Sequence, residues 1–240
     1  WSGILRIATQ TMLFIANCFA CILHFDKTQM TGELMRGFAD AVAAKGAGYV
    51  DCFGFVDRTM HAICHPTRDQ HISYNGWKRF HAVKFQGATS PDGIIWHLSG
   101  PYGGQWHDLR IFCNSPLYDI LEQFAFGPNN EPLIIYGDPA YVQSLHVQVL
   151  HKGSNLTPRQ AALNASMSQV RIASEWGYGK VTSLKGFINY THHMQLGRTP
   201  VGTIDKVAIF LTNCHTCFYG GVTSSYFNIQ PPLPEDYLCL

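Results

Sequence analysis

The chain has 240 residues, of which 46% are hydrophobic and 14% are charged. This length allows one large domain or one domain with a small appendage, and the composition argues against an intrinsically disordered chain. With 17 Lys and Arg against 16 Asp and Glu, the formal net charge is +1. The chain therefore lacks the overall basic excess that would directly indicate nucleic-acid binding, and any affinity for DNA must come from local basic clusters or from metal ions.

The amino-terminal part is apolar and predicts helices. The chain begins with Trp1 rather than Met, and we expect it to be a fragment of a longer protein. Residues 4–24 predict a largely buried helix that packs on the main domain, because the apolar run of 11–25 is shorter than the ~20 residues of a membrane span. A decayed signal-peptide core is the alternative. Residues 30–44 predict an amphipathic helix that starts near Thr31 and ends at Gly46 and Gly48. We treat 1–48 as an amino-terminal helical segment.

Three β-rich segments follow, at 52–56, 80–86 and 93–98. The first, CFGFV, is predicted to end at Asp57. The tripeptide Pro91-Asp92-Gly93 separates the other two and is typical of a tight turn. Together the three segments predict an antiparallel meander.

The elements after the meander alternate between helix and strand. Residues 107–124 have helical periodicity that Pro116 must interrupt, and 132–136 predict a strand that is buried on both faces. A long helix is predicted to start at Thr157-Pro158, and 207–211 predict a further apolar helix. The order predicts one mixed α/β domain over 49–229. The Pro-rich tail, 230–240, is predicted to be irregular.

Two acidic residues occupy equivalent places in this pattern, because Asp57 and Asp138 each come at the end of an apolar strand. If the two strands are neighbours, both carboxylates meet at one edge of the sheet. Glu175 lies in an apolar helical run, where a carboxylate is costly unless it is paired or binds a metal. Carboxylate oxygens are the ligands of Mg²⁺, and two such ions can clamp a phosphoryl group during displacement. The alternative is that the aspartates form turns or helix caps and that Glu175 faces solvent.

Four segments carry a resemblance to a known family: FGFVDRT, PYGGQWHDLRIFCNSPLY, IIYGDPAY and VRIASEWGYGKV, in this order. Over residues 31 to 230 the chain resembles the DDE endonuclease domain of PIF/Harbinger-type transposases and their domesticated relatives. The resemblance implies a ribonuclease-H-like α/β fold, with a mixed sheet flanked by helices. It also implies metal-dependent cleavage of DNA with Mg²⁺ or Mn²⁺. It assigns catalytic roles to Asp57, Asp138 and Glu175, and adds Asp108 to these three as a fourth metal ligand.

The resemblance further implies an intracellular protein that acts on DNA in the nucleus. It implies no association with a membrane, and it leaves the oligomeric state undecided. A separate DNA-binding protein is a potential partner, since no helix-turn-helix region is evident. Two positions depart from the family pattern: Arg58 replaces a glycine, and Ser174 replaces an apolar residue. Two other functions therefore stay open. One is a catalytically silent module that binds DNA or protein, which Arg58 favours. The other is a metal-independent carboxylate-pair hydrolase such as a glycosidase.

The basic clusters that are candidates for DNA contact are Lys78, Arg79 and Lys84, and Lys180 with Lys185. The alternative for each of these residues is that it lies on a solvent-exposed face of a strand or helix and does not contact DNA.

Cysteine and histidine give fewer signals. We interpret the 8 cysteines as reduced thiols of an intracellular protein. The Cys214-x-x-Cys217 spacing needs a second ligand pair to bind zinc, so two thiols in packed helices are the preferred interpretation. His107 is a candidate for supporting its neighbour Asp108.

Overall fold

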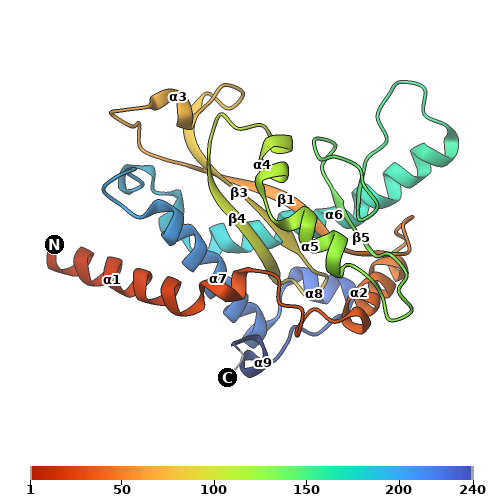
Figure 1. Ribbon diagram of the computed structural model, residues 1–240. Coiled ribbons are helices and arrows are strands. Elements are labelled where there is room, and N and C mark those ends of the chain that lie inside the picture. Colours follow the sequence, from red (N-terminus) through yellow and green to blue (C-terminus); the bar gives the residue numbers. More distant parts are fainter. Residues whose placement is uncertain (1, 239–240) are drawn as a thin grey trace.

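The computed structural model of the protein describes residues 2–238 and contains a mixed sheet between layers of helices (Figure 1). The strands are β1 (Cys52–Ala62), β2 (Tyr74–Asn75), β3 (Phe80–Thr89), β4 (Ile95–Gly103), β5 (Ile134–Gly137) and β6 (Val147–Val149). The helices are α1 (Ser2–Phe19), η1 (Ala20–Leu23), α2 (Gly32–Ala44), α3 (Gln70–Ser73), α4 (Asp108–Asn114), α5 (Leu117–Phe124), α6 (Pro158–Leu184), η2 (Gly186–Asn189), η3 (Thr191–His193), α7 (Val201–Tyr219), α8 (Val222–Phe227) and α9 (Pro234–Leu238).

The sheet combines an antiparallel half with a parallel half. β3 pairs antiparallel with β1 and with β4, so the predicted meander is confirmed, and the short β2 adds to the edge of β3. On its other side β1 pairs in parallel with β5, which in turn pairs in parallel with β6. This six-stranded mixed sheet flanked by helices is the ribonuclease-H-like fold class that the sequence predicts.

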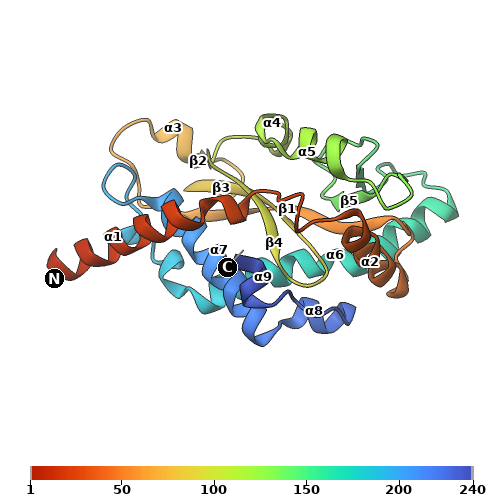
Figure 2. The ribbon, with the colours of Figure 1, turned by 60° about the horizontal axis from the view of Figure 1, so that its bottom comes forward.

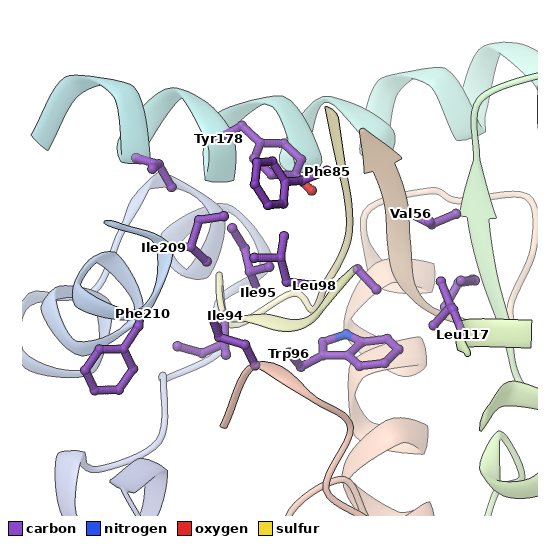
Figure 3. Close-up of a cluster of buried hydrophobic side chains, with 14 of the residues drawn as sticks. Val56, Phe85, Ile94, Ile95, Trp96, Leu98, Leu117, Tyr178, Ile209 and Phe210 are labelled. Atoms are coloured by element: carbon purple, nitrogen blue, oxygen red, sulfur yellow. The ribbon is translucent and has the colours of Figure 1, made fainter. Parts of the chain in front are cut away.

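The sheet is covered on both faces. Figure 2 shows α4 and α5 on one side of the sheet and α6, α7 and α8 on the other. Figure 3 shows part of the main hydrophobic cluster, in which Trp96 and Leu98 of β4 lie among Val56, Leu117 and Ile209. A second cluster packs α6 on β1 and β5 through Val170, Ala173, Phe55 and Tyr136, among others. Burial of large apolar side chains on both faces holds α6 in a fixed position over the central strands.

Several predicted boundaries are confirmed and have a visible cause. Thr31 caps α2 by accepting from the amide of Leu34, and Thr157 caps α6 by accepting from the amide of Gln160. The helical stretch that Pro116 was expected to interrupt is divided into α4 and α5. The Pro91-Asp92-Gly93 turn joins β3 to β4. Seven cysteines of the described part are free, and Cys239 lies outside the described residues. The proposed boundaries at 48 and 229 stay predictions.

Three expectations are wrong. β1 does not end at Asp57, because residues 57–62 continue its antiparallel pairing with β3. The tail is not irregular throughout, since α9 forms within it.

The third concerns the amino-terminal helix, which is only partly buried. Phe19 stacks on Phe210 of α7 with ring centroids 4.8 Å apart, but Ile4, Leu5, Ile7 and Phe14 are at least 60% exposed. Within residues 2–238, none of the helices combines the length and apolar character that a membrane crossing requires.

Candidate active site

Asp57 and Asp138 lie side by side on neighbouring strands. The parallel register pairs Val56 of β1 with Gly137 of β5, and the two aspartates are the next residues of each chain segment. Because paired strands with equal register present the same face, both side chains point to the same side of the sheet. Gly137 permits this approach, since a β-carbon there would lie 2.7 Å from a methyl group of Val56 and 2.9 Å from the ring of Tyr141. The prediction that the two strands are adjacent is confirmed.

Helix α6 contacts Asp57 with one face. Ser174 donates to Oδ2 of Asp57 over 3.3 Å, and the hydroxyl of Tyr178 donates to the carbonyl of Asp57 over 3.3 Å. Residues four positions apart share a helix face, so both contacts come from the same side of α6. Gly87, which pairs with Asp57 across the sheet, leaves the space that the Tyr178 hydroxyl occupies. Ser174, a departure from the family pattern, therefore has a defined place in the site.

The Asp57 carboxylate is only partly compensated. Burial raises the pKa of its carboxyl group above the ordinary value, and the neighbouring carboxylate of Asp138 raises it further. The hydrogen bond that Oδ1 accepts from the Arg58 amide over 2.8 Å, the charge of Arg171 and the Ser174 hydroxyl act in the opposite direction. A cation beside the buried Asp57 carboxylate would stabilise its charged form against this raised pKa.

Glu175 is joined to this site by Arg171. The Nη1 atom of Arg171 lies 3.6 Å from Oδ2 of Asp57, and its Nη2 lies 3.7 Å from Oε1 of Glu175. The side chain of Glu175 is 60% exposed, whereas those of Arg171 and Asp57 are 26% and 17% exposed. The guanidinium thus lies between the strand carboxylate and the helix carboxylate.

Asp108 is held on the other face of the sheet. It forms an ion pair with Arg58, and Nζ of Lys84 lies 3.9 Å from its Oδ1. Successive residues of a strand point to opposite faces, so Arg58 points away from the side that Asp57 shares with α6. Oδ1 of Asp108 is buried and accepts no hydrogen bond from any described residue. The structure therefore brings Asp57, Asp138 and Glu175 to one face and places Asp108 apart from them.

No preformed metal centre is present in the described part of the chain. Within residues 2–238, no group of three or more His, Cys, Asp or Glu side chains is arranged to hold a metal ion, the Cys214 and Cys217 pair included. The carboxylate oxygens of Asp57 and Asp138 suit a hard cation in their chemistry. Glu175 would complete the set only after a change of side-chain position.

The basic residues that the sequence singles out differ in their availability. Lys84 is 5% exposed and donates to the carbonyl of Trp106 over 2.6 Å. Lys180 donates to the carbonyl of Gly220 over 2.6 Å. Both amino groups bind the protein itself. Lys78 and Arg79, in contrast, are exposed next to Trp77, and Lys185 is half-buried.

Two sets of residues near the site were not predicted. Arg171 was missed although it stands one helical turn before Glu175, where the spacing favours an ion pair. On the face of β1 that carries Asp57, Nδ1 of His61 lies 2.5 Å from Oδ1 of Asp205, and Nε2 of His61 lies 3.1 Å from the hydroxyl of Thr59. Asp205 is 144 positions from His61 in the chain, and no local pattern signals that contact.

Residues 56–213 match the family model described as a DDE superfamily endonuclease. The chain belongs to this family. The matched part includes all four candidate carboxylates and excludes α1, α2 and the segment from α8 onwards. No curated protein and no solved structure matches the chain.

Proposed function

We propose that the chain is the endonuclease domain of a PIF/Harbinger-type transposase or of a domesticated descendant, and that it cleaves DNA phosphodiester bonds. The observation that carries the proposal is the parallel register of β1 and β5, which puts Asp57 beside Asp138. The contact of Ser174 with Asp57 adds Glu175 at the same face. Membership of the endonuclease family supports the reaction class.

A divalent cation, Mg²⁺ or Mn²⁺, is the cofactor of this proposal, with Asp57, Asp138 and Glu175 as the residues that would hold it. It would supply the positive charge that stabilises phosphate oxygens during displacement. The chain's own residues orient the ligands. The amide of Arg58 fixes one oxygen of Asp57 and the Ser174 hydroxyl fixes the other. The exposed Lys78 and Arg79 suit contact with the phosphates of the DNA backbone. Such contacts position the protein on DNA but do not read the base sequence.

The remaining expectations from the family resemblance enter as parts of the same proposal. The protein would act in the nucleus, and a separate DNA-binding protein would deliver it to its target. An oligomeric assembly is compatible with this proposal. Asp108 pairs with Arg58 on the opposite face of the sheet. To bind the same metal as the other three carboxylates, it would have to leave this ion pair.

A second function is favoured by the two arginines at the acidic residues. Arg171 lies between Asp57 and Glu175, and Arg58 is paired with Asp108. Three of the four candidate carboxylates are thus in contact with arginine, which competes with a metal ion for their oxygens. Without the metal ion, the domain would bind DNA or protein and would not cut DNA. This is the catalytically silent alternative.

Cleavage of supercoiled plasmid DNA in Mg²⁺ or Mn²⁺ distinguishes the two functions. We expect the unaltered protein to nick the plasmid, and Asp57→Asn and Asp138→Asn to lower the rate by orders of magnitude. Asp119→Asn, which changes an exposed acid of α5, is the matched control and should cleave normally. A protein that binds DNA without cleaving it in either metal contradicts the nuclease proposal and supports the silent module.

A further inference from the structure

One cavity of the described part lies away from the candidate carboxylates. It has a volume of about 700 Å³ and is lined by three segments, 21–38, 90–96 and 229–237. None of Asp57, Asp108, Asp138 and Glu175 lines it. Two of its three walls lie outside the residues that match the endonuclease family, 56–213. A volume of this size is typical of a ligand site.

The charges around this cavity have one sign. Five acids line it, namely Asp26, Glu33, Asp92, Glu235 and Asp236, and no Lys or Arg does. The whole chain has 17 basic and 16 acidic residues, so the cavity concentrates negative charge that is balanced elsewhere. None of the five forms an ion pair with another residue of 2–238. A cationic occupant would thus find carboxylates that no other group neutralises.

The walls between the acids are apolar and aromatic. Leu34 is 41% exposed, while Phe38, Trp96 and Tyr237 line the cavity from the protein core. Trp96 is 4% exposed, and its Nε1 has no hydrogen-bond partner among the described residues. The indole N–H is closed off from the cavity, so Trp96 offers an occupant only the apolar part of its ring.

We propose that this cavity binds a basic peptide segment with apolar side chains, contributed by a partner protein. The acids come from all three walls, so a single cationic group cannot contact them all. Several Lys or Arg side chains spaced along a peptide match this spread. Apolar side chains between them would bury against Leu34 and its apolar neighbours in the cavity wall. The proposal does not depend on nuclease activity.

A fluorescein-labelled peptide of alternating arginine and leucine is the probe, with binding followed by fluorescence polarisation. We expect it to bind the unaltered chain, and a peptide of alternating glutamate and leucine not to bind. The double variant Glu33→Gln, Asp236→Asn removes two exposed acids from two different walls without altering buried groups. It should weaken binding about tenfold, since exposed ion pairs are individually modest and two are removed.

The control variant Asp119→Asn, Glu122→Gln removes the same charge from exposed positions of α5, outside the cavity. It should bind the basic peptide as the unaltered protein does. An equal loss in the control variant would show general attraction by acidic surface and would overturn the proposal. Failure of the basic peptide to bind, or equal binding of the acidic peptide, would overturn it as well.

Discussion

Arg171 and Asp57 are in direct electrostatic contact, with Nη1 of the guanidinium 3.6 Å from Oδ2 of the carboxylate. The same guanidinium reaches Glu175 one turn further along α6. A positive group thus occupies the space between two carboxylates that the family resemblance assigns to a metal. Since a guanidinium and a divalent cation would compete for the same oxygens, the affinity of the site for metal depends on this arginine.

The first prediction is that Arg171→Gln binds Mn²⁺ more tightly than the unaltered protein. Loss of one positive charge at this range should increase affinity roughly five- to tenfold, because the side chain is only 26% exposed and is moderately screened. Electron paramagnetic resonance of free Mn²⁺ measures the affinity without a cleavage assay.

Arg159→Gln is the control for this variant, because it removes the same charge from an exposed position of α6. It should leave Mn²⁺ affinity unchanged. Equal affinities of Arg171→Gln and the unaltered protein would show that Arg171 does not compete with metal. No Mn²⁺ binding in either protein would instead count against the metal-dependent function itself.

The second prediction is that Glu175→Gln abolishes cleavage without unfolding the domain. The Glu175 side chain is 60% exposed, and its ion pair with Arg171 has an N–O distance of 3.7 Å. Because exposed ion pairs contribute little to stability, the melting temperature of the variant should change little. Cleavage should fall by orders of magnitude if the charge is needed for metal binding. Comparison of melting curves and plasmid nicking for Glu175→Gln and Glu122→Gln tests this. A normal rate of nicking in Glu175→Gln would remove Glu175 from the site.

The strands and helices of this domain could be predicted where the signal lies in residues that are close together in the sequence. The meander, the two caps at Thr31 and Thr157, and the break at Pro116 each rest on neighbouring residues. The end of β1 was not predictable, because Asp57 resembles a strand terminus in sequence. In the structure the strand continues, since β3 supplies partners for residues 57–62.

The site was predictable in part, for a related reason. The adjacency of Asp57 and Asp138 follows from two apolar runs that are each followed by an acid and that form neighbouring strands. The arrangement of Asp108 does not, because strand alternation sends Arg58, and Asp108 with it, to the opposite face. Lys84 and Lys180 resemble phosphate ligands in sequence, but their amino groups bind backbone carbonyls that only the fold brings near.

The third prediction concerns two buried groups with opposite responses to acid. Burial raises the pKa of Asp92 to about 6 and lowers that of His97 to about 4. As the pH falls from about 6 to about 4, the folded state takes up a proton at Asp92 before the unfolded state does, which stabilises the fold. Over the same range the unfolded state takes up a proton at His97 first, which destabilises the fold. The two contributions, each about 2–3 kcal/mol, should largely cancel.

Single variants should separate these contributions in urea unfolding measured across this pH range. Asp92→Asn removes the contribution that stabilises in acid, so the free energy of unfolding should fall steeply as the pH drops. His97→Gln removes the opposing one, so the free energy should rise instead. Parallel pH profiles of the two variants would contradict the assigned pKa shifts.

The last prediction tests whether Arg58 is a structural partner of Asp108. The Asp108 side chain is 11% exposed and that of Arg58 is 38% exposed, so the pair is neither fully buried nor fully screened. Arg58→Gln leaves Asp108 with Lys84 at 3.9 Å as its nearest counter-charge, and should lower the free energy of unfolding by about 1 kcal/mol. Asp108→Asn alone should cost a similar amount, because Arg58 loses its partner. The double variant should cost less than the sum of the two, since no unpaired charge is left behind. Urea unfolding of the four proteins measures this coupling energy. Additive losses would mean that the ion pair contributes nothing to stability, and would contradict a structural role for Arg58 at Asp108.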